Sequence, residues 1–148
     1  MASFKGGTKL NAELGKILNK LKRASSLDIG FMGGATEADG TSVAMVAAIN
    51  EYGAPSRGQP PRPFFRGMIA RNKGEWGPAL GKAMQATGGD AERSLDILGQ
   101  EVQEELQDSI RELKSPPLAP STIARKGFAK PLIDTSTMLR SVTHKVNK

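Results

Sequence analysis

Apolar residues in the second half of the chain recur at the spacing of an α-helix. Across residues 90–113 they step by three or four positions, which averages close to the 3.6 residues of a helical turn. Asp90 has a side chain suited to an N-cap, and the acidic residues of this segment fall off the apolar stripe. The pattern predicts the longest helix of the chain, with one buried stripe and a solvated acidic face.

A shorter stretch near the N-terminus, residues 10–23, has the same spacing. Asn11 is its expected cap, and basic residues fill its second half, where a helix favours cations. We therefore expect residues 1–27 to contain an N-terminal amphipathic helix, whose lysine stripe is a solvated face or a contact for DNA. The apolar positions of this helix are Leu10, Leu14, Ile17, Leu18 and Leu21.

Two short segments instead alternate apolar and polar residues, which is the pattern of a half-buried strand. The first covers residues 26–32 and ends at a pair of glycines. The second covers residues 142–146 near the C-terminus, with His144 on the same face as Val142 and Val146. The polar, glycine-containing residues 33–42 predict a loop or hairpin after the first strand.

The remaining helices are expected to be short. Gly53 and Gly127 each follow a predicted helix at the position where a left-handed residue ends it. Pro78 suits the first turn of another helix, Ser121 is the expected cap of the helix before Gly127, and Met138 marks a last helical turn. The predicted segments are residues 41–52, 65–72, 75–87 and 118–126.

Residues 54–66 separate two of these helices and contain four prolines. Prolines exclude regular structure and favour a stiff, extended chain, so we expect residues 54–64 to form an extended arm. Phe64 and Phe65 end this segment between arginines. Two interpretations stay open: the phenylalanines anchor a loop on the core, or the arm docks on a neighbouring molecule.

Composition adds bounds to this pattern. The 148 residues are enough for a single domain, residues 1–148, with one modest core. The absence of cysteine excludes disulfides and thiolate metal sites. No apolar run approaches the roughly 18 residues of a membrane span, so we expect a soluble protein made in the cytoplasm.

The net charge of +6 is unevenly placed, with basic ends around an acidic middle at residues 75–114. Three interpretations fit this distribution. The basic ends could contact nucleic acid, copies of the chain could meet head to tail, or the opposite charges could neutralise each other within one molecule.

No constellation of catalytic residues stands out. His144 is the only histidine, and a strand residue is the better interpretation than a catalytic base. The acid and hydroxyls of Asp134, Thr135, Ser136 and Thr137 are explained by helix capping. The sequence has neither a phosphate-binding glycine motif nor a metal-ligand pattern, so we expect no enzyme activity and no cofactor.

Four motifs in a fixed order carry a family resemblance. They are N-E-Y-G at residues 50–53, P-P-R-P-F-F-R at 60–66, P-P-L-A-P-S-T-I-A-R-K-G at 116–127, and P-L-I-D-T-S-T-M-L-R-S-V-T at 131–143. With these motifs the chain resembles the neck and tail-completion proteins of tailed bacteriophages and prophages, and the resemblance spans residues 29–146. Ser136 departs from the pattern, because the family often has glycine there.

The resemblance implies an α+β protomer with a small antiparallel sheet and flanking helices. It also implies a virion protein without catalytic activity, whose copies form a ring, six-fold or twelve-fold, in the head–tail connector. Such a ring joins a head-side adaptor to the tail tube or tail terminator, and genomic DNA passes through its lumen. The alternative is a nucleic-acid-binding accessory protein that uses the basic termini.

The proline-rich arm and the basic residues near the third motif are the candidate subunit interface. For the second group, a neighbouring subunit and the DNA in the lumen both remain open as the contact. The candidate residues are Arg62, Phe64, Phe65, Arg66, Arg125, Lys126 and Lys130.

Overall fold

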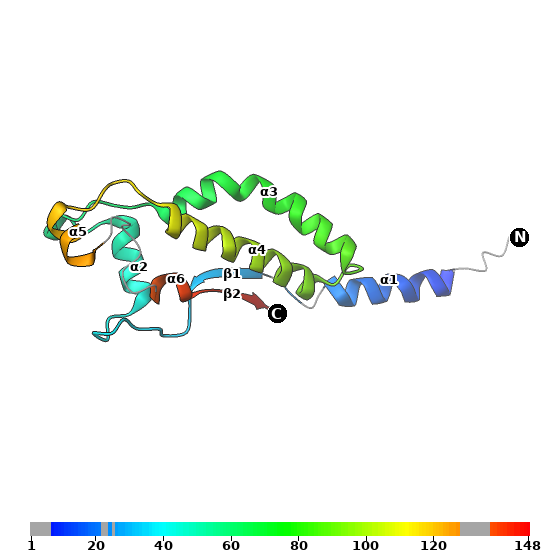
Figure 1. The fold of residues 1–148 in the computed structure, drawn as a ribbon. Helices are drawn as coiled ribbons and strands as arrows, with labels where there is room; N and C mark the ends of the chain where they lie inside the picture. Colours follow the sequence, from blue (N-terminus) through cyan, green and yellow to red (C-terminus); the bar gives the residue numbers. More distant parts are fainter. Residues whose placement is uncertain (1–6, 22–23, 25, 128–136) are drawn as a thin grey trace, which may run out of the picture.

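Helix α4 (Ala91–Glu112) is the middle layer of the fold. Helix α3 (Phe64–Ala86) packs on one side of it, and a two-stranded sheet packs on the other (Figure 1). The computed structural model describes residues 7–21, 24, 26–127 and 137–148. This arrangement confirms the expected α+β class, with a small antiparallel sheet flanked by helices.

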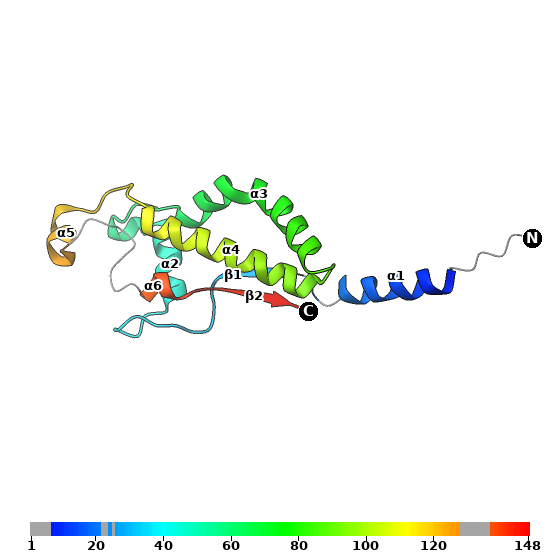
Figure 2. The ribbon, with the colours of Figure 1, turned by 45° about the vertical axis from the view of Figure 1, so that its right-hand side comes forward.

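The hydrophobic core lies between these layers and extends to helices α2 (Val43–Tyr52) and α6 (Thr137–Arg140). In the two ribbon views these short helices lie together at one end of α4 (Figures 1 and 2). Side chains from five elements meet in the core, and its largest fully buried members are Phe64, Met68, Leu106, Ile110, Val43 and Val142.

Helix α4 forms as predicted, with Asp90 as its N-cap accepting a hydrogen bond from the backbone N–H of Arg93 at 3.1 Å. Its buried surface is wider than the single stripe expected. Ser94, Gly99 and Ser109 are buried together with the apolar positions, because a helix between two layers must bury more than one face.

The two helices predicted at residues 65–72 and 75–87 are one continuous helix, α3. It is one residue longer than α4, so the prediction that α4 would be the longest helix was wrong. Pro78 lies inside it, where the missing N–H and the bulk of the ring favour a bend, and α3 arches over α4 (Figures 1 and 2). At the middle of the arch the indole N–H of Trp76 donates to Glu105 Oε2 at 2.9 Å. Packing on α4 thus keeps the helix continuous through its proline.

Both predicted strands are present, as β1 (Ser26–Phe31) and β2 (Val142–Asn147). They are antiparallel, with Ile29 opposite His144. Val142, His144 and Val146 are more buried than the residues between them, so the alternation is as expected. The polar residues that follow β1 form a turn closed by a bridge between Thr36 and Ser42, which confirms the predicted loop.

Helices α1 (Gly7–Leu21) and α5 (Pro120–Lys126) lie at opposite ends of the molecule (Figures 1 and 2). Both were predicted, but their expected caps were wrong. α1 begins before Asn11, and α5 begins at a proline, which is favoured at the first helical position, so Ser121 lies inside the helix. Gly127 ends α5 in the left-handed conformation, as expected.

Gly99 allows β2 to pack closely on α4. A β-carbon at this position would overlap the His144 ring, lying 2.8 Å from Cγ, and would lie 2.9 Å from Cδ1 of Leu27. These separations are shorter than any ordinary carbon–carbon contact, so a larger residue would push the sheet away from the helix. Nothing in the sequence pattern distinguishes this glycine from the others in helices.

Gly99→Ala should therefore lower the free energy of unfolding by about 1–2 kcal/mol, because overpacking outweighs the better helix propensity of alanine. Gly81→Ala is the matched control, since a β-carbon at this position in α3 meets nothing within 4 Å. It should raise the free energy of unfolding by about 0.5–1 kcal/mol. Urea unfolding followed by circular dichroism measures both, and equal effects of the two variants would contradict the packing argument.

Candidate subunit interface

The proline-rich segment folds back on itself and is not the extended arm predicted for residues 54–64. Pro55–Arg57 forms a 3₁₀ turn, and the backbone N–H of Ala54 donates to Gln59 O at 2.9 Å. Gly53 makes this return possible. Its φ is +78°, and a β-carbon there would lie 2.8 Å from the backbone of both Gln59 and Pro61.

Two of the candidate interface residues are buried inside the chain. Phe64 is 1% exposed and packs its ring edge against Phe31, with centroids 6.2 Å apart. Arg62 is 5% exposed, its backbone N–H donates to Asn50 O at 2.7 Å, and its Nε donates to Pro116 O at 3.3 Å. Burial lowers the pKa of the Arg62 guanidinium from its ordinary value. These contacts correct the interface assignment of both residues and support the interpretation of a loop anchored on the core.

Phe65 and Arg66 lie closer to the surface. Phe65 is half-buried, with its ring beside Gly30 of β1. Arg66 is exposed, but its guanidinium is held by the preceding helix: Nε donates to Glu51 Oε1 at 2.7 Å, and Nη2 donates to the backbone oxygen of Glu51 at 3.0 Å. It also stacks over the ring of Tyr52, 5.0 Å from the centroid. Arg66 and Tyr52 therefore present a fixed, partly exposed surface.

Glu51 is the central residue of this region, and the sequence analysis did not single it out. Its carboxylate is buried and accepts from the backbone N–H groups of Phe65 at 2.9 Å and Arg66 at 3.1 Å. These are donors in the first turn of α3, which has Pro63 at its N-cap position and no side-chain cap of its own. A carboxylate from α2 thus caps α3, favoured also by the helix dipole.

The first two motifs of the family resemblance, residues 50–53 and 60–66, are accordingly one hydrogen-bonded unit. Asn50 belongs to it as well, since its backbone oxygen accepts from Arg62 and its Oδ1 accepts from Gln59 Nε2 at 3.2 Å. Side chains in this unit form hydrogen bonds with backbone groups of the same chain. Its geometry is that of a structural clamp between α2 and α3.

Of the three basic candidates in or near the third motif, the structure describes one side chain. Arg125 is exposed on α5, at the end of the molecule opposite α1 (Figure 2). The side chain of Lys126 and the whole of Lys130 lie outside the described residues, as do the predicted caps Asp134 and Thr135. Arg125 stays a candidate surface residue.

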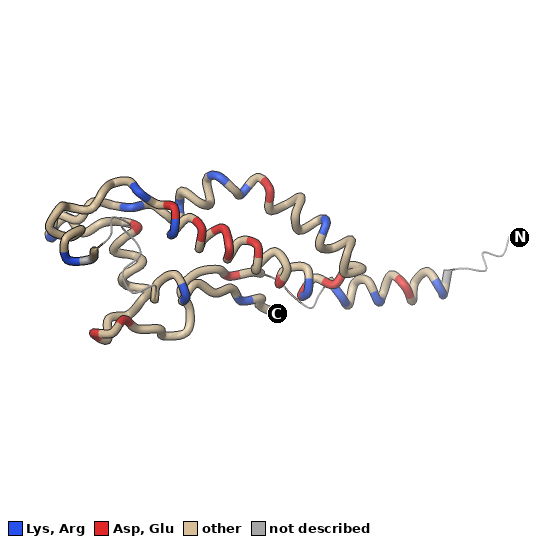
Figure 3. Tube along the Cα trace, viewed as in Figure 1, with Lys and Arg blue, Asp and Glu red and all other residues tan. Residues whose placement is uncertain are grey.

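Acidic and basic residues are concentrated on different elements. Acidic residues follow α4, while lysines and arginines follow α1, the first half of α3, and α5 (Figure 3). Some acidic residues are paired within the chain, as in the ion pair of 2.6 Å between Asp108 and Arg111. The exposed acids of α4 that remain are Glu101, Glu104 and Glu112.

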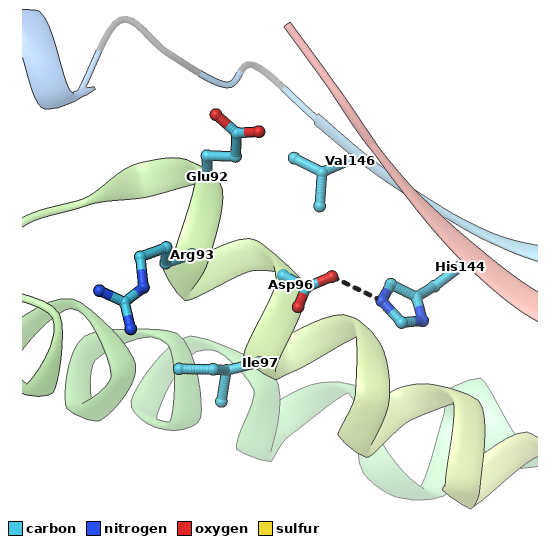
Figure 4. Close-up of a pocket in the computed structure, with 6 residues that line it drawn as sticks. All are labelled: Glu92, Arg93, Asp96, Ile97, His144 and Val146. Carbon is cyan, nitrogen blue, oxygen red and sulfur yellow. Dashed lines mark hydrogen bonds and ion pairs between the residues drawn. The ribbon is translucent and has the colours of Figure 1, made fainter.

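His144 lies in β2, as expected, at the side of an open cavity of about 400 Å³ between β2 and the start of α4. Its ring contacts Asp96 Oδ1 through Nε2 at 2.9 Å (Figure 4) and Gln103 Oε1 through Nδ1 at 2.7 Å. Ile97 and Val146 supply the apolar part of the cavity. Within the described part of the chain, no three potential metal ligands gather in one place.

Among the described residues, α1 has the largest group of exposed large apolar side chains. Its five large apolar side chains are between 42% and 61% exposed, and they form the stripe that the sequence pattern predicted. The helix runs outward from the body, and near its end Lys20 Nζ donates to Gly88 O at 3.2 Å (Figures 1 and 2). An apolar stripe of this kind is typical of a contact surface.

Comparison of the chain with models of protein families, with curated proteins and with solved structures found no match. Over the residues that the structure describes, no helix is both long enough and apolar enough to cross a bilayer.

Removing the Glu51 carboxylate should destabilise the fold strongly. We expect Glu51→Ala to lower the free energy of unfolding by about 2–4 kcal/mol, because two backbone donors of α3 and Nε of Arg66 lose their partner. Glu51→Gln keeps one acceptor oxygen and should cost about half as much. Urea unfolding monitored by circular dichroism gives both values.

The control for this prediction is Glu104→Ala, which removes an exposed carboxylate from α4. A surface change of this type should alter the free energy of unfolding by no more than about 0.5 kcal/mol. If Glu51→Ala unfolds at the same urea concentration as Glu104→Ala, the cap does not hold α2 and α3 together.

Proposed function

We propose that this chain is a structural protein of a bacteriophage neck. Its copies assemble into a ring, six-fold in preference to twelve-fold, between the head-side connector and the tail, and DNA passes through the lumen. The observation that carries the proposal is the exposed apolar stripe of α1. A protein that acts as a monomer leaves such a stripe in water at a cost, whereas a subunit of an assembly buries it.

Three further features support a structural role. The first two motifs of the family resemblance form a clamp between α2 and α3, with the buried Glu51 at its centre. The acidic α4 and the basic α1 and α5 present opposite charges to neighbours on different sides (Figure 3). Arg66 and Tyr52 add a stiff, half-exposed patch that needs little ordering before it binds a partner.

The partners of the proposed ring are other copies of this chain, a head-side adaptor, and a tail tube or tail terminator protein. Arg125 faces either a neighbouring subunit or the DNA in the lumen. Of the seven candidate interface residues, Phe65, Arg66 and Arg125 remain on or near the described surface, and the proposal rests on these and on α1.

Placing charges in the apolar stripe should remove the contacts that α1 makes with other copies without unfolding the body. We expect Leu14→Asp combined with Leu18→Asp to give smaller assemblies in size-exclusion chromatography with light scattering, under conditions where the unchanged chain forms larger ones. Negative-stain images of the unchanged chain should show rings. The unfolding transition of the body should stay in place, because α1 lies outside the core.

Ala12→Asp combined with Asn19→Asp is the matched control, since it adds the same two charges on the opposite face of α1. This variant should assemble like the unchanged chain. A chain that stays monomeric at every concentration, and also when mixed with connector and tail proteins, would refute the proposed function.

The second candidate function is nucleic-acid binding through the basic termini. Lys9 and Lys16 are exposed on α1, which favours it. Duplex DNA affinity should then fall steeply with added salt, as phosphate contacts release counterions. Fluorescence anisotropy of labelled duplex DNA over a salt series measures this slope, and no binding at low salt would exclude the alternative.

A further inference from the structure

Helix α1 has the pattern of a short coiled-coil strand. Leu10, Leu14, Ile17 and Leu21 are separated by four, three and four residues, which places them at the a and d positions of two heptads. Leu18 widens the stripe on one side. All five side chains are exposed, so the helix presents a seam that the described residues of its own chain leave uncovered.

The body of the molecule offers no matching surface. Its exposed large apolar side chains in the described residues are Met45 and Tyr52 on α2 and Ile97 on α4, and Tyr52 already stacks under Arg66. These are scattered single residues and cannot cover a stripe of five. The α1 helix of a second copy carries an equal stripe, of equal length and spacing, so it is the fitting occupant.

Charge decides the relative direction of two such helices. Glu13 and Lys20 lie one heptad apart beside the seam, both at the g position, while Lys9 and Lys16 point away from it. In an antiparallel pair Leu10 faces Leu21 of the other copy. Glu13 of each copy then faces Lys20 of the other copy, so the pair has two such contacts. In a parallel pair Glu13 faces Leu18 and gains no ion partner.

The contacts that these two residues make in the single chain do not oppose the pairing. Glu13 Oε1 accepts from Lys16 at 2.9 Å, and Lys20 donates to Gly88 O at 3.2 Å. Both contacts are exposed to solvent, where such interactions contribute little and exchange readily. Pairing can therefore replace them at small cost.

We infer that α1 binds antiparallel to α1 of a second copy of this chain, with the leucine and isoleucine seam buried and Glu13 paired to Lys20 in both directions. The inference rests on the assembly role proposed above and specifies one contact between copies of the chain. An antiparallel pair obeys a two-fold axis. It is therefore not the repeating contact around a cyclic ring, and it joins two protomers, or two rings, through their α1 helices.

The pair is small, because each helix of 15 residues is only about 22 Å long. One pair alone falls short of the roughly 1,200 Å² that a stable interface buries. Several pairs acting together between two rings bind far more tightly than one, since each later contact forms within an assembly. The contact is thus weak between free protomers and strong between assemblies.

The absence of cysteine from the chain makes the orientation directly testable. Leu10→Cys and Leu21→Cys are purified separately, mixed under reducing conditions and then oxidised. We expect a disulfide-linked dimer of one chain of each kind, with the 10–21 link identified by peptide mass, and little product from either variant alone. Lys9→Cys mixed with Lys16→Cys, at outward positions, controls for random collision.

Charge reversal tests the ion pairs independently of cross-linking. Glu13→Lys and Lys20→Glu should each weaken self-association by about tenfold, since two attractive pairs become repulsive. Mixing these two variants should restore it, because every facing pair is then again of opposite sign. Lys9→Glu, outside the seam, is the matched control and should associate normally. Sedimentation velocity measures the association of each sample.

The outcomes separate this inference from the proposed function. Links between like positions, 10–10 or 21–21, indicate a parallel pair and overturn the inference. Oligomers that form without any 10–21 link also overturn the inference, but they leave the proposed neck role intact. A chain that never associates overturns both. Dimers with 10–21 links but no rings in negative stain support the pair and contradict the neck role.

Discussion

The fold depends on a single buried carboxylate that joins the end of one helix to the start of another. Glu51 lies at the end of α2 and accepts from the first turn of α3, which has no cap of its own. Without it, a proline-led helix would begin in a buried place with unsatisfied donors. Ser109 Oγ of α4 donates to Phe64 O at 2.7 Å in the same turn. The start of α3 is thereby fixed against both of its neighbours, and α3 and α4 together carry most of the core.

Periodicity alone predicted the elements with a regular apolar pattern. The strands, α1 and α4 were found because their apolar residues alternate or repeat in a simple way. The split of α3 at residues 73–74 was wrong, since the local rule that places Pro78 in a first helical turn was outweighed by packing on α4 along the helix. The prediction of an extended arm was wrong for a related reason. The positive φ of Gly53 turns the chain back, and the prolines that follow this glycine do not indicate the turn.

The candidate interface could be predicted only in part, because exposure is a property of the whole fold. Phe64 and Arg62 look like docking residues in a proline-rich sequence, yet one fills the core and the other holds two carbonyl groups. Glu51 was missed because an acid at the end of a helix ordinarily faces solvent. The sequence signal that could have found it is the arginine fifteen residues later, next to a helix start without a capping side chain.

A motif that makes a protein resemble a family need not be the surface on which the family acts. Residues 50–53 and 60–66 are specific because a buried carboxylate, a left-handed glycine and a capped helix leave few alternatives at those positions. These residues determine the shape of the protomer, and they affect its contacts with other molecules only through that shape. The stripe of α1 is the reverse case: its leucines are exposed among the described residues, so the fold of the single chain does not explain their pattern. The clamp thus accounts for the fold, and the exposed helix is the basis of the proposed assembly.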